Sequence, residues 1–119
     1  MTSLLHAAFA AAILSFAYTT TAFATGAIAV NDEQGMSAED AGYGLGYGGS
    51  KKEASANAVR ECKSAGNDSC EVVLTFEKCG AYIGNKAYYA TGVGATEAAA
   101  YKAAKAECPD CKLIVSDCH

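Results

Sequence analysis

Large and small side chains alternate in two segments of the chain, and each segment is followed by a stretch with helical spacing. In YGLGYG (43–48) and YATGVG (89–94), glycine or alanine occupies every second position. A period of two is typical of β-strands, here with one face of large side chains and one nearly bare face. Small residues then recur at every fourth position, as on one face of a helix: Ala54, Ala58 and Cys62, and again Ala100, Ala104 and Cys108. The pattern predicts two strand–helix pairs in close contact.

Polar residues mark the start of each predicted helix. Ser50-Lys51-Lys52-Glu53 has the sequence of a capping box, and Thr96 can cap the second helix. Apolar or β-branched runs flank each strand–helix pair. They are GAIAV (26–30) and VVLTF (72–76) in the first unit, and GAYIG (80–84) and LIV (113–115) in the second. Each unit is therefore predicted to run strand, strand, helix, strand.

The two units are copies of one another. Residues 41–62 align without a gap to residues 87–108. The coinciding pairs are Tyr43 with Tyr89, Gly46 with Gly92, Gly48 with Gly94, Ser50 with Thr96, Ala54 with Ala100, Ala58 with Ala104, Glu61 with Glu107, and Cys62 with Cys108. Between its first two strands the first copy inserts a polar, acidic segment, residues 31–41, where the second copy has the short connection Gly84-Asn85-Lys86.

This duplication predicts the domain organisation. We expect a single α+β domain over residues 25–119, made of two ββαβ repeats at about 26–79 and 80–118. A pseudo-twofold axis relates the repeats, and the domain has a largely antiparallel sheet and two helices.

Gly44, Gly46 and Gly49 also satisfy G-x-G-x-x-G, the motif that holds a dinucleotide pyrophosphate. The second copy has Ala90 and Ala95 at two of the three positions, and the segment before the motif does not have the pattern of a buried parallel strand. We therefore interpret the glycines as packing positions and expect no cofactor.

The first 24 residues differ in character from the rest. An apolar run from Leu4 to Ala17 is followed by Ala22-Phe23-Ala24, the A-x-A pattern of a signal-peptide cleavage site. The run is shorter than the ~20 residues that a membrane-spanning helix needs. We predict a cleaved signal peptide over residues 1–24, and a periplasmic or secreted mature chain that begins at Thr25 and is not attached to the membrane.

All six cysteines of the chain lie beyond residue 24, as expected of disulfides in a small exported domain. Six cysteines allow 15 pairings. Cys70 and Cys79 bracket a strand and so lie roughly 30 Å apart at ~3.3 Å per residue, which leaves only one of them near Cys62. The short connection favours Cys70, and the repeat extends this choice to the second copy. The predicted pairs are Cys62–Cys70, Cys108–Cys111 and Cys79–Cys118, the last tying the two repeats together.

The duplicated arrangement resembles the exported bacterial family catalogued as domain of unknown function 4189. Its members share a small-residue G-x-G strand, an alanine-rich helix that ends in cysteine, and a second cysteine followed by a β-prone run, often in two copies. The likeness covers the whole chain after residue 24 and includes the register of both copies. It implies export and an α+β fold, and it implies no reaction and no catalytic residue.

Cys108-Pro109-Asp110-Cys111 is a C-x-x-C sequence of the kind found in thiol oxidoreductases. In those enzymes the first cysteine lies at a helix N-terminus, where the helix dipole lowers the pKa of the thiol. Cys108 instead ends a predicted helix, where the dipole disfavours a thiolate. A structural disulfide is the favoured interpretation, and a thiol-disulfide oxidoreductase that uses these cysteines is the alternative function.

Other catalytic and metal-binding patterns are incomplete in this sequence. His119 is the only histidine beyond residue 24, which excludes Ser-His and Cys-His arrangements within the domain and leaves no clustered zinc ligands. We expect Glu39-Asp40, Glu61 and Glu107 to be solvated surface residues. A net charge of −4, with lysines scattered among acids, gives no reason to expect nucleic acid or an anionic membrane as partner. We therefore expect no enzyme and no bound metal.

Tyrosines remain as candidate binding residues, because their rings are apolar and their hydroxyls polar. Tyr43, Tyr47 and Tyr89 share the large faces of their strands, and Tyr82, Tyr88 and Tyr101 lie nearby in sequence. The core is the favoured place for Tyr43 and Tyr89, while core and interface stay equally open for the others. Tyr47, Tyr82, Tyr88 and Tyr101 form the predicted binding surface. The function predicted is a non-enzymatic module, of inhibitor or immunity type, that binds another exported protein.

Overall fold

The computed structural model describes residues 25–33 and 35–119. The predicted signal peptide over residues 1–24 lies outside these residues. In chain order the elements are β1 (Thr25–Asn31), the short 3-10 helix η1 (Ala38–Asp40), β2 (Tyr43–Gly48), α1 (Lys51–Ser64), β3 (Cys70–Phe76), β4 (Cys79–Gly84), β5 (Tyr89–Gly94), α2 (Glu97–Glu107) and β6 (Lys112–Cys118). No helix within these described residues is long and apolar enough to cross a membrane.

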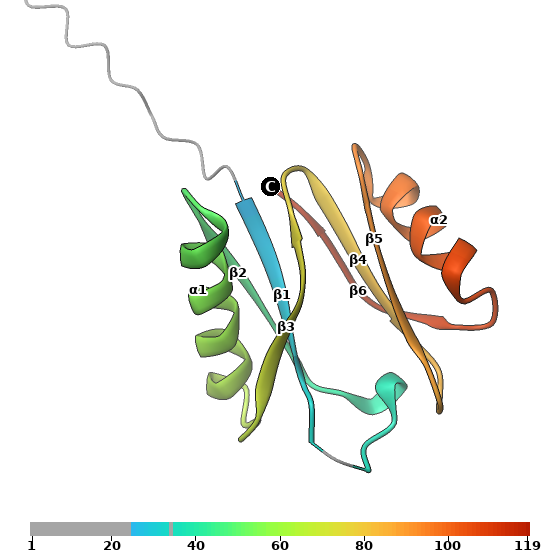
Figure 1. Ribbon diagram of the computed structural model, residues 1–119, viewed down its shortest axis with the longest axis horizontal. Helices are drawn as coiled ribbons and strands as arrows, with labels where there is room; N and C mark the ends of the chain where they lie inside the picture. Colours follow the sequence, from blue (N-terminus) through green and yellow to red (C-terminus); the bar gives the residue numbers. More distant parts are fainter. Residues whose placement is uncertain (1–24, 34) are drawn as a thin grey trace, which may run out of the picture.

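The strands form two antiparallel three-stranded sheets, in the orders β2-β1-β3 and β5-β4-β6. The sheets face each other, with α1 on the outer face of the first and α2 on the outer face of the second (Figure 1). This arrangement confirms the α+β class and the two ββαβ units. It has two sheets where the sequence predicted one, because the last strand of each unit pairs with the first strand of the same unit.

Close contact between strand and helix explains the glycines. A side chain on Gly44 or Gly46 would overlap the backbone of Cys62 or Ala58 in α1. On Gly92, a Cβ would lie 2.5 Å from the backbone nitrogen of Ala104 in α2. The bare strand faces therefore let each helix backbone rest directly on its sheet, as the period-two pattern predicted.

The caps of both helices are formed. The Ser50 hydroxyl accepts a hydrogen bond from the Glu53 backbone N–H at 3.2 Å, and the Thr96 hydroxyl accepts one from Ala99 at 3.1 Å. The Glu53 carboxylate reaches back to the N–H of Gly49 at 3.3 Å, one residue before the N-cap. Each helix start thus satisfies backbone donors that would otherwise lack a partner.

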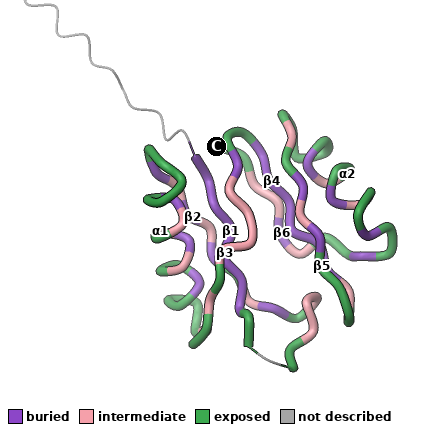
Figure 2. Tube along the Cα trace, in the orientation of Figure 1, coloured by how far each residue is buried: buried purple, intermediate pink, exposed green. Residues whose placement is uncertain are grey.

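The largest side chains meet between the two sheets. Ile28 and Phe76 of the first sheet pack with Tyr82 and Val115 of the second. Figure 2 shows that buried residues run along the central strands β1 and β4. Residues of both repeats therefore pack against each other in this inter-sheet core.

Phe76 fits the inter-sheet core because two glycines face it. A Cβ on Gly26 or on Gly80 would lie 2.5 Å from an atom of its ring. The two glycines occupy equivalent positions in β1 and β4. The Phe76 ring therefore occupies space that is free because neither glycine has a side chain.

The six cysteines form three disulfides. Cys62–Cys70 joins the last turn of α1 to β3, Cys108–Cys111 joins the end of α2 to the approach to β6, and Cys79–Cys118 joins β4 to β6. These are the three pairs that the sequence predicted. The expected role of Cys79–Cys118 was wrong: it does not tie the two repeats together. A turn at residues 77–78 places Cys79 at the start of β4. The bond therefore lies within the second sheet, where Cys79 and Cys118 are register partners.

The described part of the acidic insertion, residues 31–33 and 35–41, reaches from the first sheet to the second. The backbone N–H of Glu39 in η1 donates to the carbonyl of Asn85 at 3.3 Å. Gly84 lies so close to Ala38 that a Cβ there would be 3.0 Å from it. The insertion therefore covers one end of the space between the sheets (Figure 1).

Candidate functional site

A hollow of about 220 Å³ opens between the two sheets beside the acidic insertion. We call it the inter-sheet pocket. Its apolar lining includes Val30, Met36, Val73, Tyr82, Tyr88 and Tyr89. The volume is below the ~300–1,000 Å³ typical of sites for drug-sized ligands. The pocket therefore suits one side chain or a similarly small group.

Tyr82 connects the pocket to the core. It is 2% exposed, its ring centroid lies 5.7 Å from that of Tyr89, and its hydroxyl donates to the carbonyl of Ala38 at 3.5 Å. Burial raises the pKa of the Tyr82 hydroxyl, and the nearby Tyr89 raises it further. The Tyr82 ring is thus almost closed to solvent and forms part of the pocket lining.

Tyr88 and Tyr89 form the exposed rim. They are 70% and 57% exposed, and Met36 from the acidic insertion is 40% exposed. These three residues, which come from both repeats, gather at one opening. Large apolar side chains held in water at a pocket mouth are typical of an interaction site.

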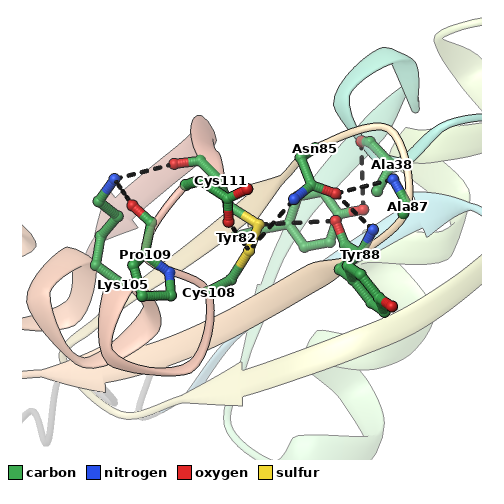
Figure 3. The surroundings of a disulfide bond; sticks show 10 residues. Ala38, Tyr82, Asn85, Ala87, Tyr88, Lys105, Cys108, Pro109 and Cys111 are labelled. Carbon is green, nitrogen blue, oxygen red and sulfur yellow. Dashed lines mark hydrogen bonds between the residues drawn. A yellow bond between two sulfur atoms is a disulfide. The ribbon is translucent and has the colours of Figure 1, made fainter.

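Asn85 sets the conformation of the hairpin that carries Tyr88. Its side-chain oxygen accepts hydrogen bonds from the backbone N–H groups of Ala87 at 2.8 Å and Tyr88 at 2.6 Å. Its amide nitrogen donates toward the sulfur of Cys108 at 3.7 Å (Figure 3). Asn85 thus links this connection, residues 85–88 between β4 and β5, to the disulfide at the end of α2. We call the connection, together with Tyr89, the tyrosine hairpin.

Asn31 forms a similar turn in the first repeat. Its side-chain oxygen accepts from the N–H of Glu33 at 2.9 Å, in the same type of turn that Asn85 forms. Neither residue was predicted from the sequence as a functional position, although the signal was present. Asn31 and Asn85 directly follow the aligned runs GAIAV and GAYIG, so the alignment would have paired them.

Charged residues also line the pocket. Asp32 and Glu33 come from the acidic insertion, Glu71 from β3, and Lys86 from the tyrosine hairpin. All four are exposed. The Asp32 carboxylate also accepts a hydrogen bond from Ser69. Three carboxylates against one ammonium group give the pocket mouth an excess of negative charge.

The predicted tyrosine surface does not form as one patch. Of its members, Tyr82 and Tyr88 share the inter-sheet pocket. Tyr47 is half-buried at a different site, where its hydroxyl donates to Asp117 and its ring centroid lies 6.0 Å from that of His119. Tyr101 is half-buried where α2 packs on the second sheet.

The core positions predicted for Tyr43 and Tyr89 are wrong. Tyr43 is 41% exposed and Tyr89 is 57% exposed. Both lie at the start of an edge strand, β2 or β5. Their strand faces do point away from the helices, but the inter-sheet core is centred on β1 and β4, so these rings extend past its margin.

Cys108 and Cys111 are 6% and 2% exposed, so their sulfurs are buried. Cys108 lies at the C-terminal end of α2. Lys105 donates to the carbonyl of Pro109 at 2.6 Å and to that of Cys111 at 3.2 Å, which closes the loop over the bond (Figure 3). Thiol-disulfide exchange needs an accessible sulfur and is helped by the N-terminal end of a helix, and this bond has the opposite surroundings.

The remaining acidic candidates are at the surface. Glu61 and Glu107 are exposed on their helices, and Asp40 in η1 accepts a hydrogen bond from Ser37 at 2.7 Å. Glu39 is partly buried beside Asn85. Across residues 25–33 and 35–119, no group of three or more histidine, cysteine or acidic side chains is placed to hold a metal ion.

Comparison with known proteins places this fold in a family. The NMR structure of Rv1813c from Mycobacterium tuberculosis is similar, with a TM-score of 0.55 and 23% sequence identity over 78% of this chain and 75% of that chain. This likeness is one of fold. No curated protein matches the chain. The model of the family described as "Domain of unknown function (DUF4189)" matches residues 25–118, which include both repeats and all six cysteines. The chain therefore belongs to the DUF4189 family.

Proposed function

We propose that this protein is an exported binding module, of inhibitor or immunity type, that docks another exported protein at the inter-sheet pocket. The observation that carries the proposal is the gathering of Met36, Tyr88 and Tyr89 around one opening. Tyrosine and methionine are enriched in protein–protein interfaces. Their exposure here costs solvation free energy that a partner would recover.

The rim is held in place before any partner arrives. Asn85 fixes the backbone of Tyr88, and the Cys108–Cys111 disulfide lies directly behind Asn85. A rigid anchor loses less conformational entropy on binding than a flexible one. The three disulfides also suit a small domain outside the cell, where such bonds persist.

Site-specific photo-crosslinking tests this proposal. A benzophenone amino acid replaces Tyr88 in one variant and Lys52, which is exposed on α1, in a control. Both variants are irradiated in the native envelope and culture fluid. We expect a crosslinked protein with the Tyr88 variant that is absent with the Lys52 variant and weakened by adding Tyr89→Ala. Identical crosslinks at both positions, or none at Tyr88, would contradict the proposal.

A further inference from the structure

The inter-sheet pocket combines three features that belong to different parts of the chain. It is hollow, and its lining includes tyrosines as well as the acidic residues Asp32, Glu33 and Glu71. From this combination we infer that the pocket receives an arginine side chain of the docked partner. The inference rests on the proposed function and specifies its chemistry.

Size limits what can enter. About 220 Å³ of space is too little for a folded segment or a drug-sized ligand, and it is suitable for one long side chain inserted from the opening. The apolar residues Val30, Val73 and Met36 would contact the methylene stem of such a side chain. Long cationic side chains bury their stems in this way while the charged end stays near polar groups.

Charge selects a cation among the long side chains. Three carboxylates and one ammonium group line the pocket, so an incoming positive charge meets a net attraction and a carboxylate meets repulsion. The carboxylates are solvent-exposed, and the attraction is therefore expected to weaken as salt screens it. A neutral side chain of equal length would gain only the apolar contacts.

The tyrosines favour arginine over lysine. Tyr88 and Tyr89 present exposed rings, and a planar guanidinium group stacks on aromatic faces as well as pairing with carboxylates through two parallel hydrogen bonds. A lysine ammonium group acts as a compact point charge and lacks the planar fork. The arrangement of rings beside carboxylates thus matches both features of the guanidinium group.

The test uses the mature, disulfide-bonded protein and three small probes. Nα-acetyl-L-arginine amide is titrated while backbone amide NMR signals are followed. The citrulline derivative is the neutral probe of the same shape, and putrescine represents a free small amine. We expect saturable shifts of Met36, Tyr88 and Lys86 with the arginine probe, and binding about tenfold weaker with citrulline, since charge-assisted hydrogen bonds are lost.

Two variants and a control examine the charges. Glu71→Gln keeps the side-chain shape and should weaken binding of the arginine probe, and Lys86→Ala should strengthen it. Glu61→Gln, at an exposed position of α1 outside the pocket lining, should leave binding unchanged. An unperturbed amide spectrum away from the pocket shows that each variant is folded. No saturable shift, equal binding of citrulline, or no effect of Glu71→Gln would overturn the inference. Tighter binding of putrescine than of arginine would overturn the assignment to a protein side chain.

Failure of this inference is distinguishable from failure of the proposed function. Crosslinking through position 88 is repeated with Glu71→Gln in the same chain. Unchanged capture of the partner would support the docking surface and contradict the inference that an arginine side chain enters the pocket. Loss of capture by Glu71→Gln but not by Glu61→Gln supports both.

Discussion

Gly46 lies where a side chain would overlap the backbone of Ala58, and Gly92 lies equally close to α2. Each of these glycines determines how near a helix can approach its sheet. Gly49, by contrast, has only one atom within 4 Å of a Cβ position, at 3.8 Å. Glycine therefore has a packing role at positions 46 and 92, whereas position 49 has space for a side chain.

Replacing Gly46 or Gly92 with valine should lower the free energy of unfolding by several times the ~1 kcal/mol typical of point mutants, because the helix backbone cannot yield as a side chain would. Gly49→Val serves as the control and should change stability little. Chemical denaturation of the oxidised protein measures all three. Similar midpoints for the three variants would refute the close-packing explanation.

Tyr82 gives the stability of the fold a measurable pH dependence. Burial, and then Tyr89, raise the pKa of its hydroxyl above the ordinary value of 10.0. Because the folded state holds this proton more tightly than the unfolded chain, the contribution to stability is complete below pH 10 and is lost as pH rises through the folded pKa. Tyr82→Phe should therefore make the loss of stability above pH 10 less steep. Denaturation at a series of alkaline pH values checks this, with Tyr88→Phe as the exposed control; equal slopes for both variants would contradict it.

At the scale of elements, the period-two alternation and the capping residues predicted most of the strands and helices. The alternation of YGLGYG and YATGVG identified β2 and β5, and Ser50 and Thr96 do cap their helices. The start of β4 at Cys79 was missed because the turn at Glu77 and Lys78 contains no glycine, proline or asparagine to mark it. Because this turn was not predicted, the Cys79–Cys118 disulfide was assigned the wrong role.

The tyrosine hairpin depends on one side chain, Asn85, whose role was not predicted from the sequence. Asn85→Ala should speed hydrogen exchange at the backbone amides of Ala87 and Tyr88, which lose their acceptor. Glu33, held by Asn31 in the other repeat, should keep its rate. Asn31→Ala should give the reverse pattern. If both variants changed both turns alike, the asparagines would not act locally.

At the scale of the whole molecule, the duplication was readable from the aligned copies, whereas the division into two sheets was not. Alternation tells which face of a strand is apolar and does not tell which strands share a sheet. The pocket was hidden for a related reason: it forms between the acidic insertion, which the second repeat lacks, and a hairpin of that repeat. Contacts such as Glu39 with Asn85 join residues of different repeats and have no local sequence signal.

Export is a prediction for the whole chain. Protein collected after export should begin at Thr25 and should be lighter than the reduced form by two hydrogens for each of its three disulfides. Intact-mass measurement before and after reduction tests both points. A mass that retains residues 1–24 would indicate an anchored chain instead.

The central claim is that the exposed tyrosines of the hairpin dock a partner protein. The most direct measurement compares the affinity of the crosslinked partner, once purified, for the parent chain and for Tyr88→Ser/Tyr89→Ser. Tyr43→Ser, which removes an exposed tyrosine outside the pocket lining, is the control. We predict a loss of at least about 2 kcal/mol, or roughly thirtyfold in Kd, for the double variant and little change for the control, as expected of aromatic anchors. Equal affinities for all three proteins would contradict the proposed docking site.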